Sequence, residues 1–114
     1  MIETCNAVIT GASLTIADHG VLSSFVSLSF SGGGQGFGGY ALSVLEIPKG
    51  PNYAGIWIVR VLQIAGVTEW DQLRGKTVRI RHEHSKVHAI GHIIEEDWFD
   101  PSVVFARMEK GSEK

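Results

Sequence analysis

The stretch "VLSSFVSLSFSGGGQGFGGYAL", residues 21–42, decides the fold. Its apolar residues at positions 22, 26, 28 and 30 are separated by even numbers, with serines between them. That period of two is typical of a half-buried strand. Six glycines follow between residues 32 and 39. They predict a turn, "SGGG", that leads into another extended segment at residues 35–47.

Working outward, residues 6–20 also predict a strand, which ends in the turn sequence "ADHG". The sequence "PKGPNY", residues 48–53, interrupts the extended pattern. Residues 54–67 then predict a helix, because apolar residues recur at positions 58, 61, 62 and 65. Gly66 is expected to end that helix.

The second half of the chain predicts further short elements. "TEWDQLRG", residues 68–75, is expected to form a short helical turn with Thr68 as its N-cap and Gly75 at its end. Residues 76–84 and 86–95 predict a hairpin around Ser85, and residues 97–111 predict a final helix.

In that last helix Asp100 is the expected N-cap and Pro101 the first helical residue, with Gly111 following its end. The order βββ-α-ββ-α predicts an α+β fold: an antiparallel sheet, made of a meander and a C-terminal hairpin, with a central helix and a short C-terminal helix.

Composition limits the function classes. The 114 residues fit a single domain, residues 1–114, with 44% hydrophobic and 19% charged residues. A net charge of -2 argues against binding to duplex nucleic acid. Cys5 is the single cysteine, which excludes an intramolecular disulfide and a cysteine-based zinc site. No long apolar run or leader pattern is present, so we expect a soluble, intracellular protein with no membrane partner.

The glycine-rich stretch does not fit a phosphate-binding loop. A P-loop needs a lysine after its glycines, and the first lysine of this chain is Lys49. A dinucleotide fingerprint needs a following helix, whereas "YALSVLEI" predicts a strand. In a strand, Gly36 and Gly38 would leave one face as bare backbone. That face would pack against the protein's own helix or a bulge, a sister subunit or a ligand.

The predicted C-terminal hairpin, "KTVRIRHEHSKVHAIGH", concentrates positive charge. It holds four of the ten Lys and Arg residues and four of the five histidines. Arg79 and Arg81 are two apart and therefore share a face of their strand. Three interpretations remain open: a solvated strand face, an anion or phosphate site, or a metal site built from His82 and His84 with a later histidine.

The sequence "EEDWFDP" places Trp98 and Phe99 together just before a helix cap, so one of them is expected to face outward. Either an aromatic staples the helix, or an aromatic forms a platform for a nucleotide base. Asp18 and His19 suit a turn as well as an acid–base pair. No nucleophile context such as Gly-x-Ser-x-Gly occurs, so binding is favoured over catalysis, with no catalytic residue, cofactor or metal expected.

Three motifs together carry a family resemblance: "DHG", "GGGQGFGGYAL" and "GHII…WFDP". Over roughly residues 3 to 106 the chain resembles small phage and prophage proteins, and among them the phage anti-Thoeris sponge proteins. Those bind cyclic ADP-ribose-type signals made by bacterial TIR-domain enzymes, and some bind cyclic oligonucleotides. The resemblance implies a homo-oligomer in the cytoplasm of an infected bacterium that sequesters its ligand without cleaving it.

The ligand-binding residues expected for such a protein follow from chemistry. Cationic groups suit a pyrophosphate, aromatic rings suit adenine, and polar groups suit ribose. The candidates are Gln35, Phe37, Arg79, Arg81, Lys86, His88, Trp98 and Phe99. Two alternatives stay open: a protein-directed inhibitor of a defence system, of the anti-CRISPR kind, and a phage structural or assembly protein.

Overall fold

The structure is a computed structural model. It describes residues 2–17, 20–30, 33–40, 42–44, 53–83 and 86–112. The expected turn pair Asp18 and His19, and the hairpin residues 84 and 85, lie outside these ranges.

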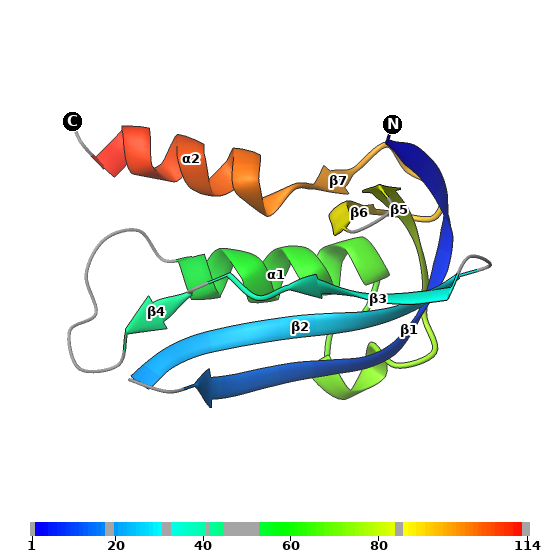
Figure 1. The fold of residues 1–114 in the computed structure, drawn as a ribbon, viewed down its shortest axis with the longest axis horizontal. Coiled ribbons are helices and arrows are strands. Elements are labelled where there is room, and N and C mark those ends of the chain that lie inside the picture. The colour runs from blue at the N-terminus through cyan, green and yellow to red at the C-terminus, as the bar shows by residue number, and fades with distance from the viewer. Residues whose placement is uncertain are drawn as a thin grey trace.

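A single antiparallel sheet forms the frame of the molecule (Figure 1). Within the described residues it has seven strands, in the order β3-β2-β1-β5-β6-β7, with β4 also pairing with β2. The strands are β1 (Glu3–Ala17), β2 (Val21–Phe30), β3 (Gly33–Gly38), β4 (Ser43–Val44), β5 (Thr77–Glu83), β6 (Lys86–Gly91) and β7 (Trp98–Phe99). The sheet curves strongly enough that β3 approaches β6, although the two are not hydrogen-bonded neighbours.

In the described ranges the sheet is accompanied by α1 (Tyr53–Ala65), the 3-10 helix η2 (Trp70–Gln72) and α2 (Pro101–Ser112). Helix α1 ends as expected, because Gly66 has a φ of 72° and its N–H donates to the Gln63 carbonyl at 3.1 Å. Asp100 caps α2, since its Oδ1 accepts the Ser102 N–H at 3.1 Å.

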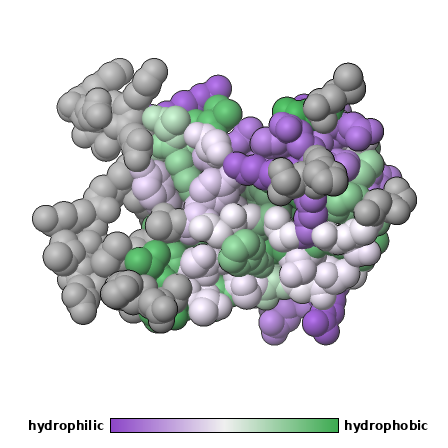
Figure 2. Space-filling model, viewed as in Figure 1, coloured by the Kyte–Doolittle hydropathy of each residue, from purple (hydrophilic) through white to green (hydrophobic). Residues whose placement is uncertain are grey.

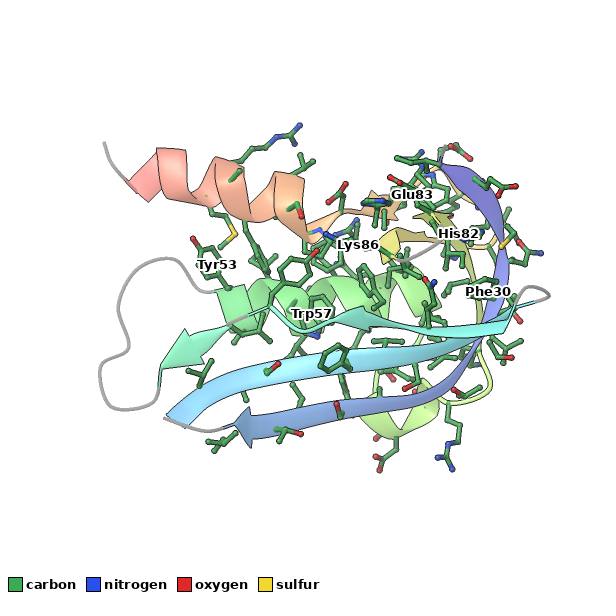
Figure 3. All side chains as sticks on the ribbon, in the orientation of Figure 1. Phe30, Tyr53, Trp57, His82, Glu83 and Lys86 are labelled. Carbon is green, nitrogen blue, oxygen red and sulfur yellow. The ribbon has the colours of Figure 1, made fainter. Side chains whose placement is uncertain are left out.

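The hydrophobic core lies between α1 and the concave side of the sheet. Trp57 points from α1 toward the sheet and has no exposed surface (Figure 3). Its ring stacks on Phe37, with ring centroids 5.1 Å apart. Phe99 completes the cluster, 5.7 Å from Trp57. The buried face of α1 contains Trp57, Val61 and Ile64, and the predicted positions 58, 62 and 65 are half-buried beside it.

The predicted α+β fold is confirmed, and so are β2 and the hairpin of β5 and β6. Some boundaries were wrong. The third strand begins at Gly33, inside the expected turn "SGGG", and ends at Gly38, because Gly38 and Gly39 take φ values of 130° and 83°. The extended pattern resumes only at β4, and residues 45–47 of the expected strand lie outside the described ranges. The N-cap of η2 is Glu69, not Thr68, and α2 continues past Gly111 to Ser112.

Candidate functional site

The outer face of β5, β6 and β7 brings together the charged side chains of the predicted hairpin. Arg79 and Arg81 alternate along β5, and both guanidinium groups lie over the indole of Trp98. The Cζ of Arg81 is 3.9 Å from the ring centroid, and that of Arg79 is 4.9 Å away. These three residues form what we call the arginine–tryptophan surface. The predicted shared face of the two arginines is confirmed.

The strand register explains why Trp98 lies on this face. Gly91 of β6 pairs with Arg79 on one side and with Trp98 on the other. A Cβ added to Gly91 would come within 2.7 Å of the Trp98 ring. The indole is therefore packed between the Gly91 backbone and the arginine side chains, which is a favourable cation–π arrangement.

The guanidinium of Arg79 donates hydrogen bonds to the loop that joins β6 to β7. Its Nε donates to the His92 carbonyl at 2.7 Å, and its Nη2 donates to the Glu95 carbonyl at 2.6 Å. Its Nη1 donates to the carboxylate of Glu96 at 2.8 Å. That hydrogen bond, helped by one from the Trp98 indole, lowers the pKa of Glu96 below its ordinary value. Arg79 therefore holds the loop in place.

Arg81 differs from Arg79 in having its donors available. Its side chain is exposed, and among the described residues it makes no hydrogen bond or ion pair. The contact with Trp98 orients its guanidinium without using its N–H groups. A guanidinium fixed in this way is suited to bidentate binding of a phosphate or carboxylate.

Lys86 and His88 extend the same face. Glu83 follows Arg81 by two residues, and it is opposite Lys86 in the register of β5 and β6. Its carboxylate lies 2.9 Å from Nε2 of His88. Figure 2 shows hydrophilic side chains gathered over this end of the molecule, whereas a pale band of serine and glycine residues covers β2 and β3.

The structure separates the other three candidates from this surface. Phe37 and Phe99 are fully buried and lie in the core around Trp57. Neither ring can stack on a ligand while the core is packed, so we remove both from the candidate site. Gln35 lies opposite core residue Leu28 on β2, and therefore on the concave side of the sheet.

The predicted outward-facing aromatic is Trp98, which is half-buried, while Phe99 points inward. The two residues form the short strand β7, which the sequence did not indicate. Consecutive strand residues point to opposite faces. Pairing with β6 therefore decides which aromatic is accessible.

The protein's own side chains cover three glycines in and just after β3. The exposed ring of Phe25 lies over Gly36 and Gly39, where an added Cβ would be 3.2 Å and 2.7 Å from it. Gly38 instead faces Trp57, at 3.0 Å from an added Cβ. The prediction that Gly36 and Gly38 share a face was wrong, because the positive φ of Gly38 interrupts the alternation.

The histidines in the described part of the chain each contact different groups. Nε2 of His82 is 3.5 Å from Sγ of Cys5, and its ring lies beside Phe30 (Figure 3). Desolvation, followed by the charge of Glu3, raises the pKa of the Cys5 thiol. His84 lies outside the described residues, and among those described no group of three His, Cys, Asp or Glu residues is placed to hold a metal ion.

Sequence reasoning missed Arg60, which holds the loop from its other side. Its guanidinium makes two contacts with the carboxylate of Asp97, at 2.6 Å and 3.3 Å. This bidentate pair lowers the pKa of Asp97. A single arginine within the apolar helix "AGIWIVRVLQIAG" was the available signal.

Comparisons with known proteins returned no matching family model, no matching curated protein and no matching solved structure. Within the described part of the chain, no helix has the length and apolar character needed to cross a membrane.

Proposed function

We propose that this protein binds a small phosphate-bearing ligand of the cyclic nucleotide class at the arginine–tryptophan surface. The contact between Arg81 and Trp98 carries the proposal. It orients an exposed guanidinium, a group that is both cationic and planar, 3.9 Å from the indole ring. Nucleotides present the matching pair of a phosphate and an aromatic base.

In this proposal Arg81 binds the phosphate, and Lys86 supplies a second positive charge from the same face. The outer plane of the Arg81 guanidinium is the stacking surface for a base, because the Trp98 ring already lies between Gly91 and the arginines. A small ligand is compatible with a net charge of -2, since it needs a local cationic site only.

We further propose, from the family resemblance, that the protein is phage-encoded and sequesters a cyclic ADP-ribose-type signal in the cytoplasm of the infected bacterium. It acts as a homo-oligomer and does not cleave the ligand. Arg79 is engaged by the loop between β6 and β7, and Glu83 contacts His88, so Arg81 and Lys86 are the cationic groups of the proposed site.

The test is isothermal titration calorimetry with cyclic ADP-ribose isomers and cyclic dinucleotides. Arg81→Ala is expected to weaken binding roughly 10- to 100-fold, as for loss of a charge-assisted hydrogen bond of about 1.5–3 kcal/mol. Arg107→Ala, an exposed arginine on α2, is the matched control and should bind normally.

The fate of the ligand is tested separately. The complex is washed and heated, and the released molecule is identified by mass spectrometry. Intact ligand supports sequestration, whereas a cleaved product would show an enzyme. If no nucleotide binds and a stoichiometric complex with a defence protein forms instead, the protein-directed inhibitor is favoured.

A further inference from the structure

The loop between β6 and β7, residues 92–97, is closed by its own hydrogen bonds. The His92 N–H donates to the Asp97 carbonyl at 2.9 Å, which joins the two ends. Nδ1 of His92 accepts the N–H groups of Ile94 and Glu95, at 3.1 Å and 3.0 Å. We call this segment the acidic loop, because residues 95–97 are Glu, Glu and Asp.

Two arginines fix the acidic loop from different elements. Arg79 of β5 donates to the carbonyls of His92 and Glu95, and Arg60 of α1 holds the carboxylate of Asp97. The backbone is therefore organised before any partner binds. Such preorganisation lowers the entropic cost of association.

Ile94 is the most exposed apolar residue of this loop. It is 82% exposed, the largest value among the exposed large hydrophobic residues described. Isoleucine is usually buried, although single apolar residues are common on protein surfaces. Ile94 is unusual because it is held outward by a loop whose backbone is fixed at both ends. An apolar side chain on a fixed backbone, beside acidic groups, suits a hollow that offers apolar contacts and a positive charge.

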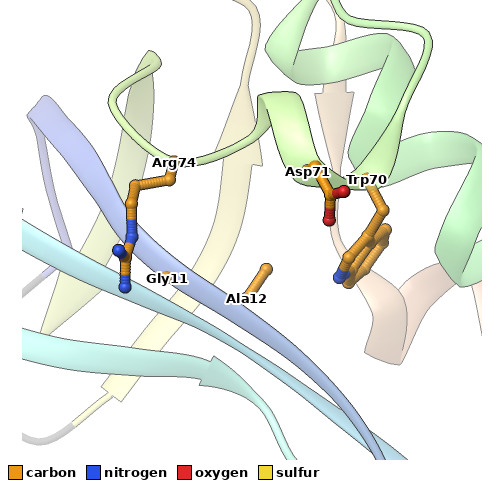
Figure 4. Close-up of a pocket in the computed structure, with 5 residues that line it drawn as sticks. All are labelled: Gly11, Ala12, Trp70, Asp71 and Arg74. Atoms are coloured by element: carbon orange, nitrogen blue, oxygen red, sulfur yellow. The ribbon is translucent and has the colours of Figure 1, made fainter.

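The same chain has a hollow of this kind between β1 and η2 (Figure 4). It has a volume of about 330 Å³ and is lined by Gly11, Ala12, Trp70, Asp71 and Arg74. We call it the crease. Trp70 and Ala12 supply its apolar surface, and the Arg74 guanidinium is fixed by an Nε hydrogen bond to the Thr10 carbonyl at 2.9 Å.

We propose that the acidic loop of one molecule docks in the crease of a second copy. Ile94 packs against Trp70 and Ala12, and Glu95 lies beside Arg74. Figure 4 shows Arg74 and Asp71 on opposite sides of Gly11 and Ala12, so charge fixes the direction of the loop, with Glu95 at the Arg74 end.

The contact joins two different surfaces and is therefore head-to-tail. In Figure 1 the short helix η2 lies at the bottom of the molecule and β7 at the top, so the two surfaces do not meet within one chain. Contacts of this type produce rings or open chains. Because Ile94 and Glu95 are the docking groups, the proposal does not depend on the nucleotide-binding role of Arg81.

Sedimentation velocity of the full chain without ligand tests the proposal. Small interfaces associate weakly, so the protein concentration is varied from about 5 to 500 μM. The weight-average mass should rise with concentration above the monomer mass of 12.4 kDa. Ile94→Asp should stay monomeric, and Ile94→Leu should associate as the wild type does. Val103→Asp, at another exposed apolar residue on α2, is the control and should also associate.

Charge exchange tests the pairing directly. Glu95→Arg and Arg74→Glu should each weaken association at least tenfold, and the double variant should restore it. Asp71→Asn should strengthen association, because it removes a negative charge from the crease. This variant keeps the hydrogen bond from Arg74 to Thr10, so it tests the pairing even if Arg74→Glu disturbs the fold. A wild type that is monomeric throughout, an associating Ile94→Asp, or a double variant without recovery would each overturn the proposal.

Discussion

Gly91 and Trp98 are paired across β6 and β7, and the indole ring occupies the space where a Gly91 side chain would be. An added Cβ would lie 2.7 Å from two ring atoms. The absence of a side chain at Gly91 therefore lets Trp98 lie against the sheet, and Trp98 in turn orients Arg81.

Gly91→Ala is expected to displace the Trp98 ring and to remove its contact with Arg81. Overpacking of this kind costs about 1–3 kcal/mol. Urea unfolding followed by tryptophan fluorescence measures the loss, and near-UV circular dichroism reports the ring displacement. Gly11→Ala is the control, because an added Cβ there has Nη2 of Arg74 as its nearest atom at 4.0 Å. Equal stability of the two variants would contradict the packing argument.

Gly38→Ala should be among the most destabilising single changes in β3. Its φ is 130°, and an added Cβ would collide with the Ser24 carbonyl and approach Trp57. Gly33 has a similar φ of 128°, but the space around its Cβ position is open. Gly33→Ala therefore measures backbone strain alone, of about 1–3 kcal/mol. The Gly38 variant should lose more free energy of unfolding than the Gly33 variant, and a smaller loss would show that β3 can shift.

The ion pair between Arg60 and Asp97 is expected to stabilise the attachment of the acidic loop to α1. The two side chains are 24% and 43% exposed, so solvent screens part of the interaction. A double-mutant cycle with Arg60→Met and Asp97→Asn should give a coupling energy of about 1–2 kcal/mol. The Cζ of Arg60 also lies 5.9 Å from the ring centroid of Phe99. A coupling energy near zero would mean that Arg60 contributes only through this packing.

The acidic loop should also respond to acid. Arg79 lowers the pKa of Glu96, and Arg60 lowers the pKa of Asp97, in both cases chiefly by hydrogen bonding. Each folded-state pKa is below the unfolded one, so the stabilisation is present above the unfolded value and is lost as the pH falls through the folded value.

NMR of the Trp98 indole N–H measures this response, because that group donates to Glu96 at 3.4 Å. Its resonance should move with a midpoint below about pH 4.3, the ordinary glutamate pKa. In Arg79→Met the midpoint should shift upward. An unchanged midpoint would show that Arg79 does not perturb Glu96.

Much of the local structure could be predicted because it depends on residues close in sequence. The alternation within residues 21–30 predicted β2, and Asp100 followed by Pro101 predicted the start of α2. The two-residue spacing of Arg79 and Arg81 predicted their common face, which their shared contact with Trp98 confirms. Each of these features needs only the backbone period of one element.

The composition of the candidate site could be predicted only in part. The basic hairpin supplied Arg79 and Arg81, but its spacing could not indicate that Arg79 is engaged by the loop and Arg81 is not. Phe37 and Phe99 were indistinguishable from exposed aromatics, because their burial depends on α1 and on the curvature of the sheet.

The sequence by itself determined the strand and helix periods, the helix ends at Gly66 and Asp100, and the concentration of positive charge in one hairpin. The tertiary structure decided which side of each strand is buried and which cation remains available. Pairing of β7 with β6 directs Trp98 outward and Phe99 inward, and the ring of Phe25 covers Gly36. The physical reason is that register and side-chain packing join residues distant in sequence, and no local period specifies those contacts.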